Sequence, residues 1–436
     1  MNFLTVDFGS TFTKVTAFNE GIIGTAKAFT TIETDVRDGL ETALAELGKQ
    51  TGSIRYDKRL AASSAGGGLK MVAVGLVPNL TAKAALMAAE SAGAKVVKTY
   101  AYELTSAEQQ EIAGIDPDLI LLSGGTDGGN KDVILNNAKK LSEIEGSFSV
   151  VAAGNKTTGD NIREILIKRG KHVVLVDNVM PALGVLDIMP AKEAIRNLFM
   201  EKIVEAKGLG AAAELMDLPL IPTPLAVLYA TELLAAEIGS LAAVDVGGAT
   251  TDVYSVCDGA STKRGVIQKG LPEPYAKRTV EGDLGMRYSL SSLIDAEPKS
   301  EGFEDFLARC NADPSYVPID GKADSVLCAK AIKIAIERHS AYLEKTYTPM
   351  GETYYQFGKD LTDVQHLIGI GGALIYSESP NEILENALNK DEFSMRLTPK
   401  NPSLLFDKKY IFAAMGLLSQ VNKKLAIKIM QREVLT

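Results

Sequence analysis

The segment Leu241–Val253 carries residues whose types and spacing suit chemistry on a phosphate. It reads LAAVDVGGATTDV, so an apolar strand ending at Asp245 leads into a turn with Gly247 and Gly248, and Asp252 follows. Such a turn can bring backbone N–H groups against a phosphate, and the carboxylates can serve the metal ion that accompanies it. This segment therefore predicts half of a phosphate-binding site.

The N-terminal segment Phe3–Val15 repeats this order as FLTVDFGSTFTKV. Asp7 ends an apolar run, and the turn after it contains Gly9, Ser10 and Thr11. A glycine in such a turn lets the backbone approach a ligand closely. Two matching half-sites in one chain predict a cleft that binds a nucleotide from both sides.

Composition and charge exclude several classes of function. The chain has 436 residues, of which 46% are hydrophobic and 23% charged, as is ordinary for a globular protein of several domains. A net charge of −9 argues against nucleic acid as a partner. The apolar runs are far shorter than the roughly 20 residues of a membrane span, and no secretion signal is recognisable. Three widely spaced cysteines fit a reducing compartment, so we expect a cytoplasmic protein without membrane contact.

The elements that must position the half-sites follow from hydrophobic periodicity. Three strands are expected in the first thirty residues, followed by an amphipathic helix from Val36. From Leu69 to Val179 strands and helices alternate, which predicts a parallel, doubly wound sheet inserted into the first half of the fold. The Gly124–Gly129 loop follows one of its strands and could either meet a ligand or be a flexible connection.

Five segments stand in a fixed order that resembles a known superfamily. They are Asp7–Lys14, the helix Pro224–Glu237, Asp245–Asp252, the strand Ile368–Ala373 and the helix Asp407–Gln420. This order resembles the phosphate-1, connect-1, phosphate-2, adenosine and connect-2 motifs of the actin, Hsp70 and sugar-kinase ATPases. The resemblance implies a two-lobed α/β fold with ribonuclease H-like lobes. Ala249 departs from the pattern, where a third glycine is usual.

Longer strings resemble one family more narrowly. They are Ser63–Leu76, Ala153–Lys156, Asp177–Pro181 and Arg278–Arg287, and the last is the most specific. They are similar to the glutamate mutase accessory family called GlmL or MutL, which is unrelated to the mismatch-repair protein of that name. We expect a first ATPase lobe from residues 1–68 and 205–239, an inserted flavodoxin-like module at 69–204 and a second lobe at 240–436.

The resemblance also implies roles for individual residues. The carboxylates of Asp7, Asp245 and Asp252 are implied to act in catalysis and to bind Mg²⁺ through the waters that magnesium retains. Asp245 is further implied as the acceptor of a proton from the attacking water. Donors to the phosphates of ATP or ADP are implied at Gly9, Ser10, Thr11, Gly247, Gly248, Ala249 and Thr250. Gly369, Gly371 and Gly372 would let the backbone pass close to the nucleoside. Lys14 could reach the phosphates or could be a solvated strand residue.

The implied function is ATP-driven reactivation of an adenosylcobalamin-dependent amino-acid mutase, with the mutase subunits as partners. Two alternatives are a small-molecule kinase on the same fold and a non-hydrolysing scaffold or filament protein. A homo-oligomer is possible. The module has the element order of a cobalamin-binding domain, but the Asp-x-His-x-x-Gly signature is missing and no histidine precedes His172. We therefore expect no bound cobalamin, and the module either imitates the mutase's cobalamin subunit or is a generic α/β insertion.

Overall fold

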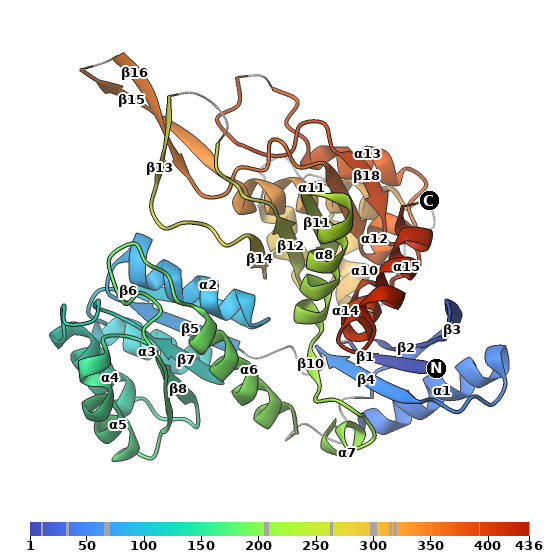
Figure 1. The fold of residues 1–436 in the computed structure, drawn as a ribbon, viewed down its shortest axis with the longest axis horizontal. Helices are drawn as coiled ribbons and strands as arrows, with labels where there is room; N and C mark the ends of the chain where they lie inside the picture. The colour runs from blue at the N-terminus through green and yellow to red at the C-terminus, as the bar shows by residue number, and fades with distance from the viewer. Residues whose placement is uncertain are drawn as a thin grey trace. The chain divides into compact units, whose positions relative to one another are not determined.

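The computed structural model describes residues 1–9, 12–31, 35–64, 70–204, 209–261, 265–296, 303–313, 316, 321–349, 351–391 and 393–435 (Figure 1). The chain divides into two compact units. The first comprises Met1–Val227, Gly270–Pro272 and Gly416–Leu425, and the second comprises Leu228–Lys269, Glu273–Met415 and Ala426–Thr436.

The first unit contains a five-stranded sheet in the order β10-β4-β1-β2-β3. Its strands are β1 (Phe3–Phe8), β2 (Phe12–Phe18), β3 (Ile22–Phe29), β4 (Lys58–Ser63) and β10 (Ile221–Pro222). β1 is antiparallel to β2 and parallel to β4. The amphipathic helix α1 (Val36–Thr51) packs its buried side, including Leu40 and Leu47, into the same core as Val6 of β1. The sequence did not predict β4, because alanine, which occurs twice in this strand, has little preference for strands.

The second unit contains a sheet with the equivalent order, β14-β12-β11-β17-β18. Its strands are β11 (Leu241–Val246), β12 (Thr251–Val256), β14 (Ala276–Glu281), β17 (His366–Ile370) and β18 (Ser403–Phe406). In the first sheet β1 lies between the antiparallel β2 and the parallel β4. In the second sheet β11 lies in the same way between the antiparallel β12 and the parallel β17. This repeated strand order confirms the predicted fold with two ribonuclease H-like lobes.

The inserted module has a parallel sheet in the order β6-β5-β7-β8-β9. Its strands are β5 (Lys70–Gly75), β6 (Lys95–Ala101), β7 (Leu119–Leu122), β8 (Ser149–Ala152) and β9 (His172–Leu175). One face packs with α3 (Ser106–Ile115), α4 (Asp132–Glu143) and α5 (Gly159–Ile167), and the other with α2 (Lys83–Ser91) and α6 (Met189–Val204). The order is that of flavodoxin-like proteins, so the doubly wound module is confirmed. The predicted boundaries of the three domains stay predictions.

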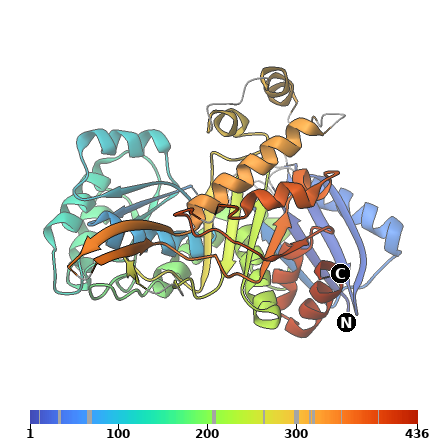
Figure 2. The ribbon, with the colours of Figure 1, turned by 90° about the horizontal axis from the view of Figure 1, so that it is seen from above.

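The remaining described elements complete the second unit and its connections. The strands β13 (Val266–Lys269), β15 (Tyr342–Thr348) and β16 (Gly351–Phe357) form a separate ribbon. Helix α11 (Lys322–His339) crosses the sheet, as Figure 2 shows, and packs on β11 and β12. The other helices are α7 (Leu209–Ala213), α8 (Thr223–Ile238), α9 (Leu290–Asp295), α10 (Glu304–Ala312), α12 (Gly372–Ile375), α13 (Pro380–Leu384), α14 (Phe412–Ser419) and α15 (Lys423–Val434), with short helical turns at Pro78–Ala82, Lys156–Thr158 and Glu385–Ala387.

The helix expected at Asp407–Gln420 starts later than predicted, at Phe412. The two carboxylate oxygens of Asp407 accept hydrogen bonds from the N–H groups of Ile411 and Phe412, each at 2.9 Å. Asp407 therefore satisfies backbone donors at the start of α14 instead of forming part of the helix. Among the described helices, none combines the length and apolar character that a membrane crossing requires.

Candidate functional site

The two half-sites occupy equivalent positions in their own sheets. In the first unit Asp7 on β1 pairs across the ladder with Lys14 on β2. In the second unit Asp245 on β11 pairs in the same way with Asp252 on β12. Each aspartate therefore lies one residue before the end of its strand, and the residue opposite it differs in charge between the units.

The turns that follow these strands share one hydrogen bond. The N–H of Gly9 donates to the carbonyl of Phe12 at 3.1 Å, and the N–H of Gly247 donates to the carbonyl of Thr250 at 2.9 Å. A Cβ on Gly9 would lie 2.6 Å from the Phe12 oxygen, and a Cβ on Gly247 would lie 2.9 Å from the Thr250 oxygen. The tight closure of the two turns therefore explains why glycine, which has no Cβ, occupies both positions. Ser10 and Thr11, predicted in the first turn, lie outside the described residues.

The carbonyl groups of the Gly247–Thr250 turn all accept hydrogen bonds from within the second unit. The carbonyl of Thr250 takes the N–H of Gly247, and the other three take donors from the Gly282–Ser289 loop. These donors are the N–H groups of Met286, Arg287 and Tyr288 and the hydroxyl of Ser289, at distances of 2.8 to 3.0 Å. The oxygen atoms of the turn are therefore held by the protein.

The N–H groups of the same turn have a different environment. No described residue accepts a hydrogen bond from the N–H of Gly248, Ala249 or Thr250, and all three residues are partly exposed. Successive backbone N–H groups that are left for a ligand form an anion-binding concavity. The turn therefore presents donors that suit phosphate oxygens, and their contact with a nucleotide stays a prediction.

The Gly282–Ser289 loop also fixes the turn by close packing. A Cβ on Gly285 would lie 2.4 Å from the carbonyl carbon and oxygen of Ala249. The hydroxyl of Thr251 donates to the carbonyl of Leu284 at 2.7 Å. This loop includes the end of the Arg278–Arg287 string that resembled the accessory family most specifically, so that string supports the turn.

Arg278 is a site residue to which sequence analysis assigned no role. Its side chain is 2% exposed, and its Nε and Nη2 donate to Oδ1 of Asp252 at 2.9 and 2.6 Å. Oδ2 of Asp252 accepts the hydroxyl of Thr250 at 3.0 Å. The ion pair balances the buried charge of Asp252, and the carboxylate orients Thr250. If Asp252 contacts a metal ion, directly or through water, its carboxylate must interact with Arg278 and with the metal at the same time.

Thr223 was also missed by sequence analysis. It starts α8, and its hydroxyl donates to Oδ1 of Asp7 at 2.6 Å. Burial raises the pKa of Asp7, while the positive charge of Lys14 and the hydrogen bond from Thr223 lower it in part. The contact joins residues 216 positions apart, so no local pattern could reveal it. The only sequence signal was a threonine between two prolines at the start of a helix.

Close contacts within the second unit explain two of the three predicted glycines near β17. A Cβ on Gly369 would meet the Leu374 side chain at 2.4 Å. Gly371 has φ +112°, and a Cβ there would lie 2.3 Å from the carbonyl oxygen of Val246. Gly372 has only ordinary contacts, with a Cβ 3.7 Å from the nearest atom of Tyr376. Contact of these glycines with a nucleoside stays a prediction.

The Gly124–Gly129 loop of the module is held by buried amides. Asn178 donates through Nδ2 to the carbonyl of Gly125 and to Oδ1 of Asp127, both at 3.0 Å. Asn155 donates to the carbonyl of Gly129 at 3.1 Å. Asn155 and Asn178 are 1% and 2% exposed and belong to two of the family-like strings. Those strings therefore build the carboxyl edge of the module's sheet.

Each half-site, taken by itself, offers a carboxylate of the kind that magnesium binds together with water and phosphate. Within the described ranges, no group of three His, Cys, Asp or Glu side chains could hold a metal on its own. Magnesium usually retains several waters and takes one or two carboxylates together with substrate phosphates. The half-buried carboxylates of Asp7 and Asp245 are oxygen donors of this kind.

Comparison with known proteins identifies relatives. Residues 3–434 match the family model described as MutL protein. The chain is 45% identical to the "Protein MutL" of Clostridium tetanomorphum over 99% of this chain and 98% of that protein.

Two solved structures show much more distant similarity. One is nucleotide-free acetone carboxylase, with 14% identity and a TM-score of 0.35 over 64% of this chain and 48% of that chain. The other is component A of (R)-2-hydroxyglutaryl-CoA dehydratase from Acidaminococcus fermentans, with 10% identity and a TM-score of 0.32 over 98% of this chain and 99% of that chain. The fold assignment rests on the strand order of the two sheets, and the family assignment rests on the near-complete sequence match. The chain belongs to the MutL protein family.

Proposed function

We propose that this protein binds and hydrolyses ATP and acts as an accessory factor that reactivates an adenosylcobalamin-dependent amino-acid mutase of the glutamate mutase type. Membership of the MutL family and the order of the five motifs support the proposal. Both half-sites contribute residues to the binding of one Mg-ATP. The mutase subunits are the partners, and the protein itself binds no cobalamin.

One observation carries the nucleotide part of the proposal. The Gly247–Thr250 turn has its carbonyl groups engaged by the protein, while the N–H groups of Gly248, Ala249 and Thr250 have no acceptor among the described residues. Such an arrangement favours an anion over a cation, because only donors remain for the ligand. A phosphate group meets this requirement.

Phosphoryl transfer depends mainly on positioning and on neutralisation of charge. The Gly247–Thr250 turn would hold phosphate oxygens through its N–H groups, and Asp245 would orient the attacking water and accept its proton. Asp7, Asp245 and Asp252 would hold Mg²⁺ through its waters, and the ion would supply charge neutralisation at the phosphates when bound. Lys14, opposite Asp7, would add positive charge for the phosphates.

Coupling to the partner requires that nucleotide affinity differ between the free and the mutase-bound states, because linkage is reciprocal. Damaged cofactor would then leave the mutase during one part of the nucleotide cycle. In this scheme the protein is an ATPase with a chaperone-like role, and its cytoplasmic location stays a prediction.

The decisive experiment compares ATP turnover and nucleotide binding in the wild type, Asp245→Asn and a matched control, Asp258→Asn, which changes an exposed aspartate of the same unit. Asp245→Asn should lose about a hundredfold or more in turnover, because it removes the proton acceptor, while its melting temperature stays close to that of the wild type. Asp258→Asn should behave as wild type. Unchanged turnover in Asp245→Asn would remove the catalytic assignment.

The same assay separates the alternatives. Turnover that requires an added sugar or carboxylic acid would indicate a small-molecule kinase, and nucleotide binding without turnover would indicate a scaffold. Reactivation is tested by adding the protein with ATP to a cyanocobalamin-inactivated mutase and measuring recovery with adenosylcobalamin. Recovery without ATP, or none with it, would contradict the accessory role.

A further inference from the structure

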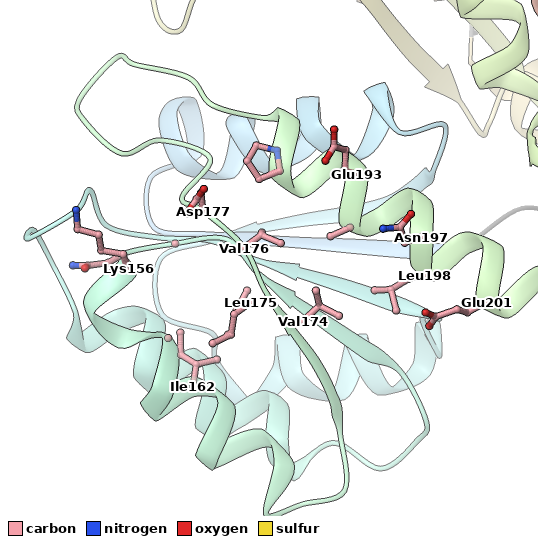
Figure 3. Close-up of a pocket in the computed structure, with 16 residues that line it drawn as sticks. Lys156, Ile162, Val174, Leu175, Val176, Asp177, Glu193, Asn197, Leu198 and Glu201 are labelled. Carbon is pink, nitrogen blue, oxygen red and sulfur yellow. The ribbon is translucent and has the colours of Figure 1, made fainter. Parts of the chain in front are cut away.

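The module has an open groove along the free edge of its sheet (Figure 3). The groove has a volume of about 700 Å³, within the range of ligand pockets. It is bordered by α5 on one side and by α6 on the other, with β9 between them. Residues of two family-like strings line it, namely Asn155, Lys156 and Asp177. The proposed ATPase uses none of these residues.

The edge strand β9 has backbone groups available for pairing. Among the described strands, β9 pairs with β8 alone, and it ends the strand order of the module. The N–H of Val176, just after β9, donates to the carbonyl of Ala152 on β8 at 3.0 Å. Because successive residues of a strand direct their backbone groups to opposite sides, Val173 and Leu175 direct theirs to the free edge. An unpaired edge of this kind is a template for another strand.

The floor of the groove is apolar. Val174 and Leu175 of β9 are only partly buried, and both line the groove. Ile162 of α5 and Leu198 of α6 border it from opposite faces of the sheet. Side chains of an added strand, which alternate between the two faces, would therefore meet an apolar surface on each face.

The rim of the groove is acidic. Glu193, Asn197 and Glu201 follow one another at four-residue spacing on α6 and border the groove, and Asp177 lies beyond the end of β9. No described residue forms an ion pair with Glu193, Glu201 or Asp177, and all three are exposed. Among the described residues that line the groove, Lys156 is the only basic one, and its ammonium lies 3.5 Å from a carboxylate oxygen of Asp127, which offsets part of its charge.

We propose that this groove binds an extended, basic segment of a partner polypeptide as an additional strand on β9. The backbone of the segment pairs with Val173 and Leu175, its apolar side chains cover the floor, and its lysines or arginines face the carboxylates of Glu193 and Glu201. Strand addition of this kind obtains affinity from main-chain hydrogen bonds and specificity from the side-chain surroundings. The proposal does not depend on nucleotide binding, so it can fail or hold independently of the proposed function.

A direct test uses the full-length protein and a short fluorescent peptide of alternating lysine and valine, with binding followed by fluorescence anisotropy. Two further peptides have matched lengths: one replaces lysine by glutamate, and one keeps the sequence but carries N-methyl groups that remove the backbone donors. We expect the first peptide to bind, with affinity falling as salt rises, and each of the others to bind about tenfold or more weakly.

Two double variants locate the binding surface. Glu193→Lys with Glu201→Lys reverses the rim and should weaken the lysine–valine peptide by about tenfold or more. Glu143→Lys with Glu145→Lys makes the same change of charge at exposed positions of the module outside the groove and should leave binding unchanged. The rim positions are also exposed, so both variants should fold, as melting curves will check.

Three outcomes would overturn the proposal. Equal binding of the N-methylated peptide would show that no strand is added. Equal loss in both double variants would show a non-specific charge effect. Competition by spermidine at the affinity of the peptide would identify the groove as a site for small organic cations instead.

Discussion

At the scale of single residues, the site depends on charges that the protein balances internally. Arg278 and Asp252 form an ion pair that is almost entirely buried, and Asp252 in turn holds the hydroxyl of Thr250. In the first unit Asp7 is opposite Lys14 and holds the hydroxyl of Thr223. Each half-site thus has a carboxylate that accepts a threonine hydroxyl. Among the described residues, a buried arginine pairs with the carboxylate of the second half-site and none pairs with that of the first.

Removing this arginine should be costly. Arg278→Met leaves the buried carboxylate of Asp252 without its partner, and we expect the free energy of unfolding to fall by about 3–5 kcal/mol. Arg309→Met is the control, because Arg309 pairs with Asp305 and the two side chains are 55% and 79% exposed, so its removal should leave the free energy of unfolding nearly unchanged. Urea unfolding of both variants measures the difference, and similar losses would contradict the argument from burial.

Lys359 predicts how stability depends on pH. It is 0% exposed, and its ammonium donates to the carbonyls of Pro274 and Tyr275 at 2.8 and 2.6 Å. Burial lowers its pKa from 10.5 to about 8. Between these values the unfolded chain binds more protons than the folded chain, so this group makes the free energy of unfolding rise with pH.

The matched measurement compares the wild type with Lys359→Met in urea at several pH values. From pH 8 to pH 10 the wild type should gain about 2 kcal/mol relative to the variant, which lacks the titrating group. The absolute stability of the variant matters less than this slope. Parallel pH profiles for the two proteins would show that Lys359 keeps its ordinary pKa despite its burial.

At the scale of elements, the Gly282–Ser289 loop decides the shape of the Gly247–Thr250 turn. Its backbone N–H groups and the Ser289 hydroxyl engage the carbonyls of the turn, and Gly285 lies against the backbone of Ala249. A glycine also permits close backbone packing in the first unit, where a Cβ on Gly416 of α14 would lie 1.7 Å from the carbonyl oxygen of Ala226 of α8. The small residue at this position lets the two helices approach closely.

Gly285→Ala tests the loop directly. The added methyl would meet backbone atoms of Ala249 at 2.4 Å, so the turn must move, and we expect ATP affinity to fall by about tenfold or more. Gly114→Ala is the control, because nothing lies within 4 Å of its Cβ position and alanine favours the helix it occupies. Isothermal titration gives both affinities. Wild-type affinity in Gly285→Ala would show that the turn does not bind the nucleotide or tolerates displacement.

At the scale of the whole molecule, the module shares a core with the first sheet. Leu4 and Val6 of β1 belong to the same buried cluster as Leu121 of β7, whereas Leu122 belongs to a cluster within the module. The two leucines are adjacent on one strand, face opposite sides and are both 0% exposed. Among the described residues, one face of the module's sheet therefore shares a buried cluster with the first sheet, and the other face belongs to a cluster of the module's own.

These leucines make a matched pair of variants. Leu121→Ala and Leu122→Ala should each destabilise by about 2–5 kcal/mol, because each leaves a cavity in a buried core. Native-state hydrogen exchange should show faster exchange of the β1 amides in Leu121→Ala, and smaller changes there in Leu122→Ala, where the effect stays within the module. Equal acceleration of β1 in both variants would mean that the first unit opens only as a whole.

The sequence by itself determined the strands and turns of both half-sites and the parallel module. These features depend on local signals, namely the alternation or run of apolar residues, a glycine in a tight turn, and an aspartate at the end of a strand. Asp7, Gly9, Asp245, Gly247 and the order of the module's strands could be identified in this way. Ser10 and Thr11 were predicted in the first turn, and they stay a prediction because they lie outside the described residues.

Only the tertiary structure decided which side chains complete the half-sites. Thr223 contacts Asp7, which lies 216 positions away in the sequence. Arg278 of β14 contacts Asp252 of the neighbouring strand β12, 26 positions away. The free edge of β9 is equally invisible in the sequence, because its exposure depends on which strand pairs with it. Local periodicity specifies where a strand runs and which residues share a face. The partner of a buried charge is chosen by the packing of distant segments, since a carboxylate removed from water needs a donor from whatever element the fold places beside it.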